Sequence, residues 1–314
     1  MSPPELAGCL EERFGERLKR DVPLGRLTTY RIGGPAALYL EPGSRSDLEA
    51  VARCLQTAGE GVPIITLGRG SNLVISDKGW PGLVLRLAPR AFSFTRPGDG
   101  PDSVVAGAAT SLPVVANWAA RRGLSGLEFM ISIPGSIGGA VRMNAGANGG
   151  ETSGALAMAT VLDLSSGELT ERKAPELKLS YRQSNLTEQD VVLDATFELV
   201  PQTEDEVRAR LESFRKHRAE TQPPAVQNAG STFKNPAGDH AGRLVAAAGL
   251  KGFRVGGVEV SRLHANFFVS DETATAQDVY DLVHEVARRV KEDCGIELEP
   301  EVKFTGEFED RSPT

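Results

Sequence analysis

Glycine placement constrains the fold of this chain more than any other feature. Glycine supplies 34 of 314 residues, a larger share than the average of about 7%. Strictly periodic glycine would predict collagen and scarce apolar residues would predict disorder, but the glycines follow no period and the chain is 40% hydrophobic. Glycine clusters between apolar segments indicate a globular fold whose backbone approaches something closely. The clusters are Gly33-Gly34, Gly68-Gly70, Gly135 to Gly150, the surroundings of Gly230, and Gly249 to Gly257.

Capping residues and a 3.6-residue apolar period predict four helices. Each follows a Ser or Thr, and three of the four have a carboxylate three residues later. A glycine is expected to end the last helix, because glycine readily adopts the left-handed conformation. The expected starts are Ser46 with Glu49, Ser111 (a helix that ends near Gly123), Thr203 with Glu206, and Thr275 with Asp278, and the expected stop is Gly295.

Short apolar runs predict strands between these helices. They cover residues 63–67, 83–87, 104–108 and 191–200, and residues 161–169 are expected to form a hairpin. The first 200 residues are β-rich and the remainder alternates helix and strand, so the expected class is α+β. The length predicts about two domains, and we place their boundary at Pro201-Gln202, which gives domains 1–201 and 202–314.

Charge and cysteine content limit the partners and the compartment. The net charge is -7 and no stripe of Lys or Arg occurs, so a nucleic-acid partner is not expected. An acidic chain that binds an anion must use backbone N–H clusters and a few placed cations. Three widely spaced cysteines, Cys9, Cys54 and Cys294, argue against a disulfide framework and a CxxC metal site, and favour a reducing compartment.

The termini and histidines add three expected absences. The N-terminal segment has early Pro and Glu and no apolar core, so no signal peptide is expected. No apolar run approaches the ~20 residues that span a bilayer, and we expect a cytosolic protein. The four histidines are scattered without an HExxH pattern, so no metal site is expected.

The segment LGRGSNLVIS, Leu67 to Ser76, predicts a strand, a glycine turn and a second strand. Gly68 and Gly70 let such a turn expose consecutive N–H groups to phosphate oxygens, and Ser71 and Asn72 can add side-chain donors. The residues alone favour an ordinary tight turn. The segment is neither a Walker A loop nor a Rossmann motif, because it lacks the Gly-Lys-Ser/Thr ending and a following capped helix.

A second glycine-rich segment, IPGSIGGAVRMNAGANGGE, spans Ile133 to Glu151. It is too rich in Gly and Ala to predict a packed helix or a free-standing strand. Interleaved apolar residues favour a packed, ligand-lining loop over a flexible one. Gly138-Gly139 would let a flat ligand approach the backbone, and Asn144 and Asn148 can hold polar atoms.

Three further segments carry residues suited to chemistry. Arg182 in LSYRQSNL offers a forked cationic donor for a carboxylate, although a surface salt bridge is the simpler interpretation. Ser231 in GSTFKNP has no neighbouring His, so a hydrolase triad is not indicated, but its hydroxyl could donate a proton with a partner's help. Glu301 in LEPEVKF lies among three glutamates, a pattern that is usually a solvated face.

Together these strings, with TTYRIGGPA at Thr28 to Ala36, resemble the UDP-N-acetylenolpyruvoylglucosamine reductase family over roughly residues 20 to 306. The resemblance implies a two-lobed FAD-binding domain of the p-cresol methylhydroxylase and vanillyl-alcohol oxidase type at 1–201, split near 65–70. A smaller α+β substrate-binding domain would follow at 202–314. The implied non-covalent FAD contacts are Gly68, Gly70, Ser71, Asn72, Ser136, Gly138, Gly139 and Asn144.

The resemblance also implies roles for residues outside the glycine loops. Arg182, Ser231 and Glu301 would be catalytic, with Ser231 as proton donor, and Tyr181, Lys234 and Asn235 would bind substrate. His264 and Asn266 could serve the substrate or pack in the core. Arg142 departs from the family, because many relatives carry Tyr there. The short span from Tyr181-Arg182 to Pro201 indicates the shorter, type II form of the family.

The implied reaction reduces UDP-N-acetylglucosamine enolpyruvate to UDP-N-acetylmuramate for peptidoglycan, with FAD as cofactor and NADPH as hydride donor. NADPH would leave before the enolpyruvyl substrate enters the same cleft. Two alternatives stay open: another FAD-dependent oxidoreductase of this fold that uses oxygen, and a non-catalytic flavin- or nucleotide-sugar-binding module. We expect a monomer without nucleic-acid or membrane partners.

Overall fold

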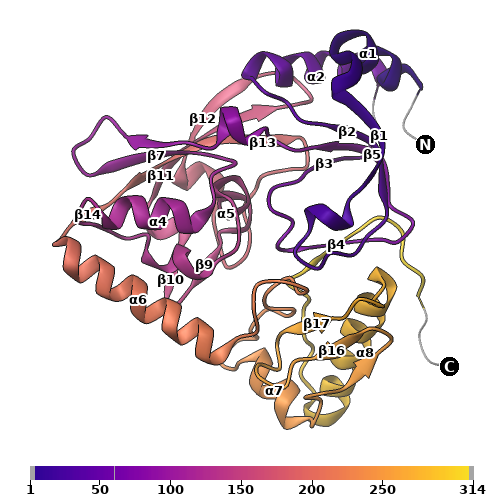
Figure 1. Cartoon of the computed structure of the whole chain (residues 1–314), viewed down its shortest axis with the longest axis vertical. Helices are drawn as coiled ribbons and strands as arrows, with labels where there is room; N and C mark the ends of the chain where they lie inside the picture. The colour runs from indigo at the N-terminus through magenta and orange to yellow at the C-terminus, as the bar shows by residue number, and fades with distance from the viewer. Residues whose placement is uncertain (1–3, 60, 311–314) are drawn as a thin grey trace. The chain divides into compact units, whose positions relative to one another are not determined.

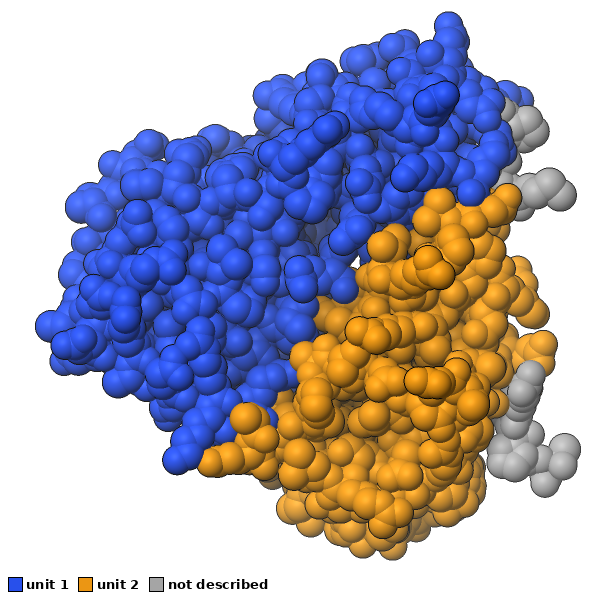
Figure 2. Space-filling view, viewed as in Figure 1, with its two compact units in different colours: residues 1–20, 38–69, 82–218 blue, residues 21–37, 70–81, 219–314 orange. Residues whose placement is uncertain are grey.

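The computed structural model describes residues 4–59 and 61–310 (Figure 1). These residues form two compact units, shown in different colours in Figure 2. Unit 1 comprises residues 1–20, 38–69 and 82–218, and unit 2 comprises 21–37, 70–81 and 219–314. Residues 1–3 of the N-terminal segment, on which part of the signal-peptide prediction rested, lie outside the described residues. None of the helices in the described residues is long and apolar enough to cross a membrane.

Unit 1 is built on a five-stranded sheet in the order β12-β11-β13-β7-β6, with antiparallel pairing throughout. Helices α4 and α5 contribute buried apolar residues to the same core. The predicted hairpin is confirmed, because β11 and β12 pair with Leu162 opposite Leu169. The elements are α1 Pro4–Phe14, α2 Arg45–Ala58, β3 Ile64–Thr66, α3 Pro89–Phe92, β6 Thr95–Pro97, β7 Ser103–Gly107, α4 Leu112–Ala120, β8 Leu124–Ser125, α5 Ile137–Met143, β9 Gly146–Ala147, β10 Gly150–Glu151, β11 Leu156–Asp163, β12 Leu169–Lys173, β13 Asp190–Glu198, β14 Val200–Pro201 and α6 Glu204–Thr221.

A second sheet has the order β1-β2-β5-β3. Its strands β1 Leu18–Pro23, β2 Pro35–Leu40 and β5 Trp80–Leu85 each contain a point at which the chain passes from one unit to the other. Strand β3 pairs in parallel with β5, with Ile64 opposite Leu83. The predicted strands at 63–67 and 83–87 are thereby confirmed, with small shifts of their ends.

Unit 2 packs the long helix α8 Ala276–Cys294 over a small antiparallel sheet, β15 Arg254–Val255, β16 Val258–Val260 and β17 Phe268–Ser270. Its other elements are β4 Leu73–Ile75, α7 Ala241–Ala247 and β18 Lys303–Thr305. The capping box of Thr275 and Asp278 is confirmed, and Gly295 ends α8 at φ 72°. The apolar residues on one face of α8 are fully buried: Val279, Leu282, Val283, Val286 and Val290.

Two local predictions are wrong. Helix α2 is capped by Ser44, whose hydroxyl accepts from the Asp47 N–H at 3.1 Å, and not by Ser46 with Glu49. The second glycine-rich segment contains helix α5, although the sequence predicted a loop. Burial of Ile137, Ala140 and Val141 offsets the low helix propensity of its glycines.

The compact units differ from the predicted division at residues 201 and 202. The first part of α6 belongs to unit 1, because Val207 and Leu211 are buried in its core and Arg210 pairs with Glu128 at 2.9 Å. Two early segments belong to unit 2. Tyr30 is buried in the unit 2 core, and β4 pairs in parallel with β18. Sequence order alone gave no sign that residues 21–37 and 70–81 would pack with the C-terminal third.

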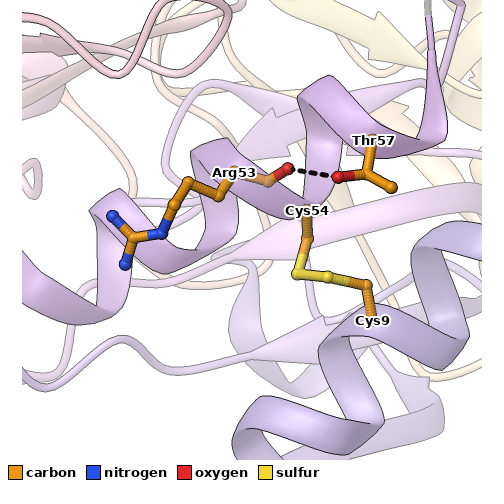
Figure 3. Close-up of a disulfide and its surroundings, with 4 residues drawn as sticks. All are labelled: Cys9, Arg53, Cys54 and Thr57. Atoms are coloured by element: carbon orange, nitrogen blue, oxygen red, sulfur yellow. Dashed lines mark hydrogen bonds between the residues drawn. A yellow bond between two sulfur atoms is a disulfide. The ribbon is translucent and has the colours of Figure 1, made fainter.

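Cys9 on α1 and Cys54 on α2 form a disulfide, with Cα atoms 5.6 Å apart (Figure 3). The cysteine pattern argued against a disulfide framework, and this single bond was not predicted. One bond across 45 residues has no spacing signature in the sequence, and the pair meets only because Leu6, Leu10 and Phe14 bury one face of α1 in the core of unit 1. The cysteine argument for a reducing compartment is lost with it.

We expect reduction of this disulfide to destabilise unit 1. A cross-link across 45 residues stabilises a fold by roughly 2–4 kcal/mol, mainly by restricting the unfolded chain. Thermal unfolding with and without dithiothreitol measures the effect as a lower Tm in reductant. The double variant Cys9→Ser with Cys54→Ser is the control, since its Tm should be the same with and without reductant. An unchanged Tm for the reduced parent protein would contradict the prediction.

Candidate cofactor and substrate site

The two glycine-rich segments meet in unit 1. A Cβ atom added to Gly68 would lie 2.6 Å from the Ser136 Oγ, so the Ser136 side chain lies directly against the Gly68 backbone. Beside them lies a cavity of about 220 Å³. Its lining combines residues of both segments with Thr66 at the end of β3, residues that follow β5 and β7, and the start of β13: Thr66, Leu67, Gly68, Arg69, Arg86, Leu87, Pro89, Ser93, Ala108, Ala109, Ser111, Val114, Ser136, Gly138, Gly139, Arg142, Asp190 and Val192.

Helix α5 gives this cavity its glycine wall. Ser136 is buried in extended backbone just before the helix. A Cβ on Gly138 would press on the Ala108 Cβ at 3.1 Å, so Gly138 packs against protein. A Cβ on Gly139 would meet only the Ser136 Oγ, at 3.6 Å. Because Gly139 has no side chain, the cavity reaches its backbone, which suits a ligand that approaches the backbone closely.

Arg142 forms a rigid polar side of the cavity. Its guanidinium donates to the carbonyls of Leu186 at 3.4 Å and Thr187 at 3.0 Å, and also to the Asp190 carbonyl at 2.5 Å. Burial lowers the pKa of Arg142, and the charges of Asp190 and Glu188 oppose that shift. The Asp190 carboxylate is held in turn by Arg172 at 2.7 Å. Arg142 thus braces the loop before β13 instead of offering its charge to the cavity.

Sequence reasoning missed part of this lining. Arg86, Ser93 and Asp190 lie outside every motif, and Ser111 was noted only as a helix start. No local signal marks them, because they reach the cavity from the ends of separate strands and from the segments that follow them.

The remainder of the first glycine loop belongs to unit 2. Gly70 has φ 61°, and a Cβ there would lie 2.5 Å from the Leu27 carbonyl oxygen, so the protein's own backbone requires glycine at this position. The Asn72 side chain donates to the Glu301 carbonyl at 3.2 Å. The Lys303 N–H donates back to the Asn72 carbonyl at 3.0 Å, where β4 and β18 begin to pair. Ser71, between Gly70 and Asn72 in the sequence, is half-buried.

The Asn144 side chain binds backbone groups of the protein itself. It is fully buried with φ 41°, its amide donates to the Ser180 carbonyl at 3.0 Å, and its oxygen accepts from the Ser153 N–H at 2.9 Å. Ser180 opens the tight turn that carries Tyr181 and Arg182, because Ser180 and Gln183 exchange backbone hydrogen bonds. The amide nitrogen of Asn144 therefore anchors this turn, and its oxygen holds the Ser153 backbone.

The turn presents Arg182 from a left-handed backbone, at φ 57°. Its guanidinium donates to the Gly146 carbonyl at 2.8 Å and lies over the Tyr181 ring, 4.9 Å from the ring centre. Tyr181 itself is exposed. A backbone conformation that is uncommon for a non-glycine residue, held by hydrogen bonds on both sides, is typical of a functional position.

Unit 2 brings the other predicted residues together. Residues 231–233 form a short extended segment in which Ser231 bridges Phe267 and Phe233 bridges Pro300. The Glu301 N–H donates to the Thr232 carbonyl at 2.7 Å, which places Glu301 beside the segment that begins with Ser231. Ser231 and Glu301 are both part-exposed, whereas Thr232 between their backbones is fully buried.

Lys234 and Asn235 follow directly and have protein partners. The Lys234 ammonium is mostly buried and pairs with Glu299 at 2.5 Å. The Asn235 oxygen accepts from the Ala241 N–H at 3.0 Å, at the start of α7. Lys234 therefore places a positive charge, held by Glu299, close along the chain to Ser231.

These features suit a flavin. The unit 1 cavity offers a bare glycine wall, backbone at a strand–turn–strand loop and the side chains of Arg69 and Arg86, which match a flat ligand with an anionic tail. Unit 2 offers a hydroxyl, an ammonium and a carboxylate on adjoining segments, the groups that proton transfer to a substrate requires. Fold and site define an FAD-dependent oxidoreductase. Residues 36–171 match the model of an FAD binding domain.

Residues 222–305 match the model described as "UDP-N-acetylenolpyruvoylglucosamine reductase, C-terminal domain". The chain is 43% identical to the reductase of that name from Rhodopseudomonas palustris (strain BisB5), with 96% of each protein covered. It is 44% identical to that of Rubrobacter xylanophilus, with 96% of this chain and 99% of the relative covered. The crystal structure of the Thermus caldophilus reductase aligns with a TM-score of 0.79 at 36% identity, covering 92% of this chain and 99% of that one. The chain belongs to the UDP-N-acetylenolpyruvoylglucosamine reductase family.

Proposed function

We propose that this chain catalyses the NADPH-dependent reduction of UDP-N-acetylglucosamine enolpyruvate to UDP-N-acetylmuramate, with Arg182, Ser231 and Glu301 as its catalytic residues. FAD is the cofactor of this family and supplies the hydride chemistry when bound. The observation that carries the assignment is the hydrogen bond of 2.7 Å from the Glu301 N–H to the Thr232 carbonyl, which joins the Ser231 and Glu301 segments in one fixed register.

Each of the three residues has a role that its chemistry supports. Hydride addition to the terminal enolpyruvyl carbon leaves negative charge on the substrate, and the Arg182 guanidinium is suited to stabilise it with oriented donors. Ser231 then donates its hydroxyl proton to the adjacent carbon. A serine hydroxyl is too weak an acid to act unaided, so the nearby Lys234 charge would stabilise the alkoxide left on Ser231, which water then reprotonates. Glu301 would act with Arg182 to polarise the enolpyruvyl group. Tyr181 and Asn235 would contact the rest of the substrate.

The cofactor contacts are proposed in narrower form than the sequence suggested. Gly68, Ser136, Gly138 and Gly139 line or border the unit 1 cavity and would hold FAD through backbone and hydroxyl groups. We also propose Ser71 as a contact of the anionic tail of FAD. Gly70, Asn72 and Asn144 hold protein atoms and would shape the loops around the cofactor. Binding would be non-covalent, because none of the described residues that line the cavity is His or Cys.

Gly139→Val should yield protein that purifies without yellow colour. The added methyl groups would occupy the cavity where the native chain offers only the Ser136 Oγ at 3.6 Å. Quenching of FAD fluorescence on titration measures the loss, and we expect an affinity lowered by about 100-fold or more, the scale of a few kcal/mol of steric conflict.

Gly154→Val provides the control, because a Cβ added to Gly154 would have no atom within 4 Å and Gly154 does not line the cavity. It should remain yellow. Full FAD affinity in Gly139→Val would remove this wall from the cofactor site. Gly70→Val is a poor test, since its Cβ would collide with the Leu27 and Thr28 backbone whether or not FAD binds.

An anaerobic flavin titration tests the activity itself. Wild-type protein should lose its yellow colour with NADPH and regain it when the enolpyruvyl substrate is added. An oxidase of the same fold would regain colour only with oxygen, and a non-catalytic binding module would not be bleached by NADPH. Either result would contradict the proposal.

We propose the cytoplasm as the location, where NADPH and UDP-sugars are made, and a monomer as the working form. The proposed domains remain an FAD-binding part, 1–201, and a substrate-binding part, 202–314. Sedimentation of the holoprotein would measure the oligomeric state.

A further inference from the structure

A buried amide in unit 2 reaches the backbone beside Ser231. Asn266 is 4% exposed, its Oδ1 accepts from the Phe233 N–H at 2.9 Å, and its Nδ2 donates to the Phe233 carbonyl at 2.8 Å. The backbone carbonyl of Asn266 also accepts from the Thr232 N–H at 2.8 Å. One residue therefore makes three hydrogen bonds to the two residues that directly follow Ser231.

The Asn266 amide pairs both backbone groups of Phe233. Phe233 is 1% exposed, so its N–H and carbonyl have no access to water. Leaving either one unpaired would cost about 1–3 kcal/mol. An Asn side chain supplies one acceptor and one donor at the spacing of a peptide group, whereas an ionised Asp supplies acceptors alone.

His264 orients the Asn266 backbone. The Asn266 N–H donates to the His264 Nδ1 at 3.2 Å, which requires that nitrogen to be unprotonated. Burial, followed by the charge of Lys251, lowers the pKa of His264 and so favours the neutral ring. The ring packs edge-on against Phe267, the residue that bridges Ser231.

The same hydrogen bonds extend to Glu301. The N–H of Thr232 is held by the Asn266 carbonyl, and the carbonyl of Thr232 accepts from the Glu301 N–H at 2.7 Å. Lys234 follows Phe233, and its backbone N–H donates to the Glu299 carbonyl at 2.9 Å. The backbone that joins Ser231, Lys234 and Glu301 is thus held against one buried residue. Both backbone polar groups of Phe233 are hydrogen-bonded to the Asn266 side chain, which favours one geometry at this position.

We infer that Asn266 is a positioning residue for the proton-transfer half of the reaction, acting through Phe233 and Thr232 on Ser231 and Glu301. The inference rests on the proposed roles of Ser231 and Glu301. Asn266 need not contact substrate or cofactor. Its loss should therefore slow reoxidation of the reduced enzyme by the enolpyruvyl substrate and spare reduction by NADPH.

The test measures both half-reactions of the holoenzyme by stopped-flow absorbance of the flavin band. Asn266→Asp at about pH 8 should slow substrate-dependent reoxidation by ~10- to 100-fold, the effect of small displacements of catalytic groups. Reduction by NADPH should change by less than about threefold on the same argument. Asn266→Ser, which introduces no charge, is the second variant and should show the same selective loss.

A pH rescue separates positioning from general damage. Burial raises the pKa of the introduced carboxyl group. When protonated, that group has an O–H that can donate to the Phe233 carbonyl as the native amide does. Reoxidation in Asn266→Asp should therefore recover toward the wild-type rate as the pH falls from about 8 to about 6, and Asn266→Ser should show no such recovery.

Two parallel variants keep the result interpretable. Ser270→Ala removes another buried hydrogen-bonding group of unit 2, whose hydroxyl donates to the Tyr30 and Gln227 carbonyls, and should lower Tm without changing the ratio of the two rates. Ser231→Ala tests the proton donor by itself. If Ser231→Ala loses reoxidation but both Asn266 variants keep the wild-type ratio, the inference is wrong and the proposed function stands. Normal reoxidation in Ser231→Ala would overturn the role of Ser231 instead.

Discussion

Ser231→Ala should be reduced by NADPH at close to the normal rate and then stay reduced when the enolpyruvyl substrate is added under anaerobic conditions. The first half-reaction requires flavin and NADPH alone, whereas the second requires a proton on carbon. General acid catalysis typically contributes about 100- to 10,000-fold, so reoxidation should slow by that factor. Stopped-flow absorbance of the flavin band measures the two rates separately.

The substitution should leave the fold intact. Ser231 is part-exposed, and its place in the sheet-like contact with Phe267 depends on backbone groups that Ala retains. Ser231→Cys serves as the matched variant and should recover part of the lost rate, because a thiol can also donate a proton. Equal slowing of both half-reactions would indicate a structural role for Ser231. Normal reoxidation would leave Glu301 or water as the proton source.

Arg182→Lys should lower kcat by roughly 100-fold or more, the scale of losing one oriented donor to a developing oxyanion. Lysine keeps the charge but loses the planar fork. In the native chain one arm of that fork donates to the Gly146 carbonyl while the guanidinium lies over Tyr181, so its orientation is fixed before substrate binds. Steady-state kinetics with the enolpyruvyl substrate measures kcat, and single-turnover reduction by NADPH should be nearly unaffected.

Arg122→Lys is the matched control for this prediction. Arg122 also lies over an aromatic ring in unit 1, that of Trp118, but it has no part in the proposed reaction. Its replacement should leave kcat unchanged. Wild-type turnover in Arg182→Lys would mean that Arg182 is a surface residue and that the assignment of this motif is incorrect.

The sequence by itself determined the elements with strong local signals. Helix α8 follows from its capping box, its apolar period and Gly295, all of which act within a few residues. The hairpin of β11 and β12 follows from the turn residues between its two strands. The family could be named as well, since the strings that hold Ser231, Arg182 and Glu301 carry the resemblance and the relatives show the family. The roles of these three residues stay predictions.

Only the tertiary structure decided which atoms those residues contact. Asn72 and Asn144 were predicted on the cofactor, yet the amide of Asn72 binds the Glu301 carbonyl and that of Asn144 binds Ser180 and Ser153. An amide next to glycines looks the same in a sequence whether its partner is a ligand or a distant carbonyl. Gly70 and Gly139 likewise look the same in the sequence, although backbone surrounds Gly70 and the cavity borders Gly139.

Long-range pairing decided the remainder. Helix α5 forms in a glycine-rich segment because the core of unit 1 buries its apolar residues, and Cys9 meets Cys54 because two helices pack together across 45 residues. Asn266 acquires its role from Phe233, which lies 33 positions earlier in the chain. Local sequence encodes backbone preference and side-chain chemistry, whereas these contacts depend on which buried surfaces exclude water together, a property of the whole folded chain.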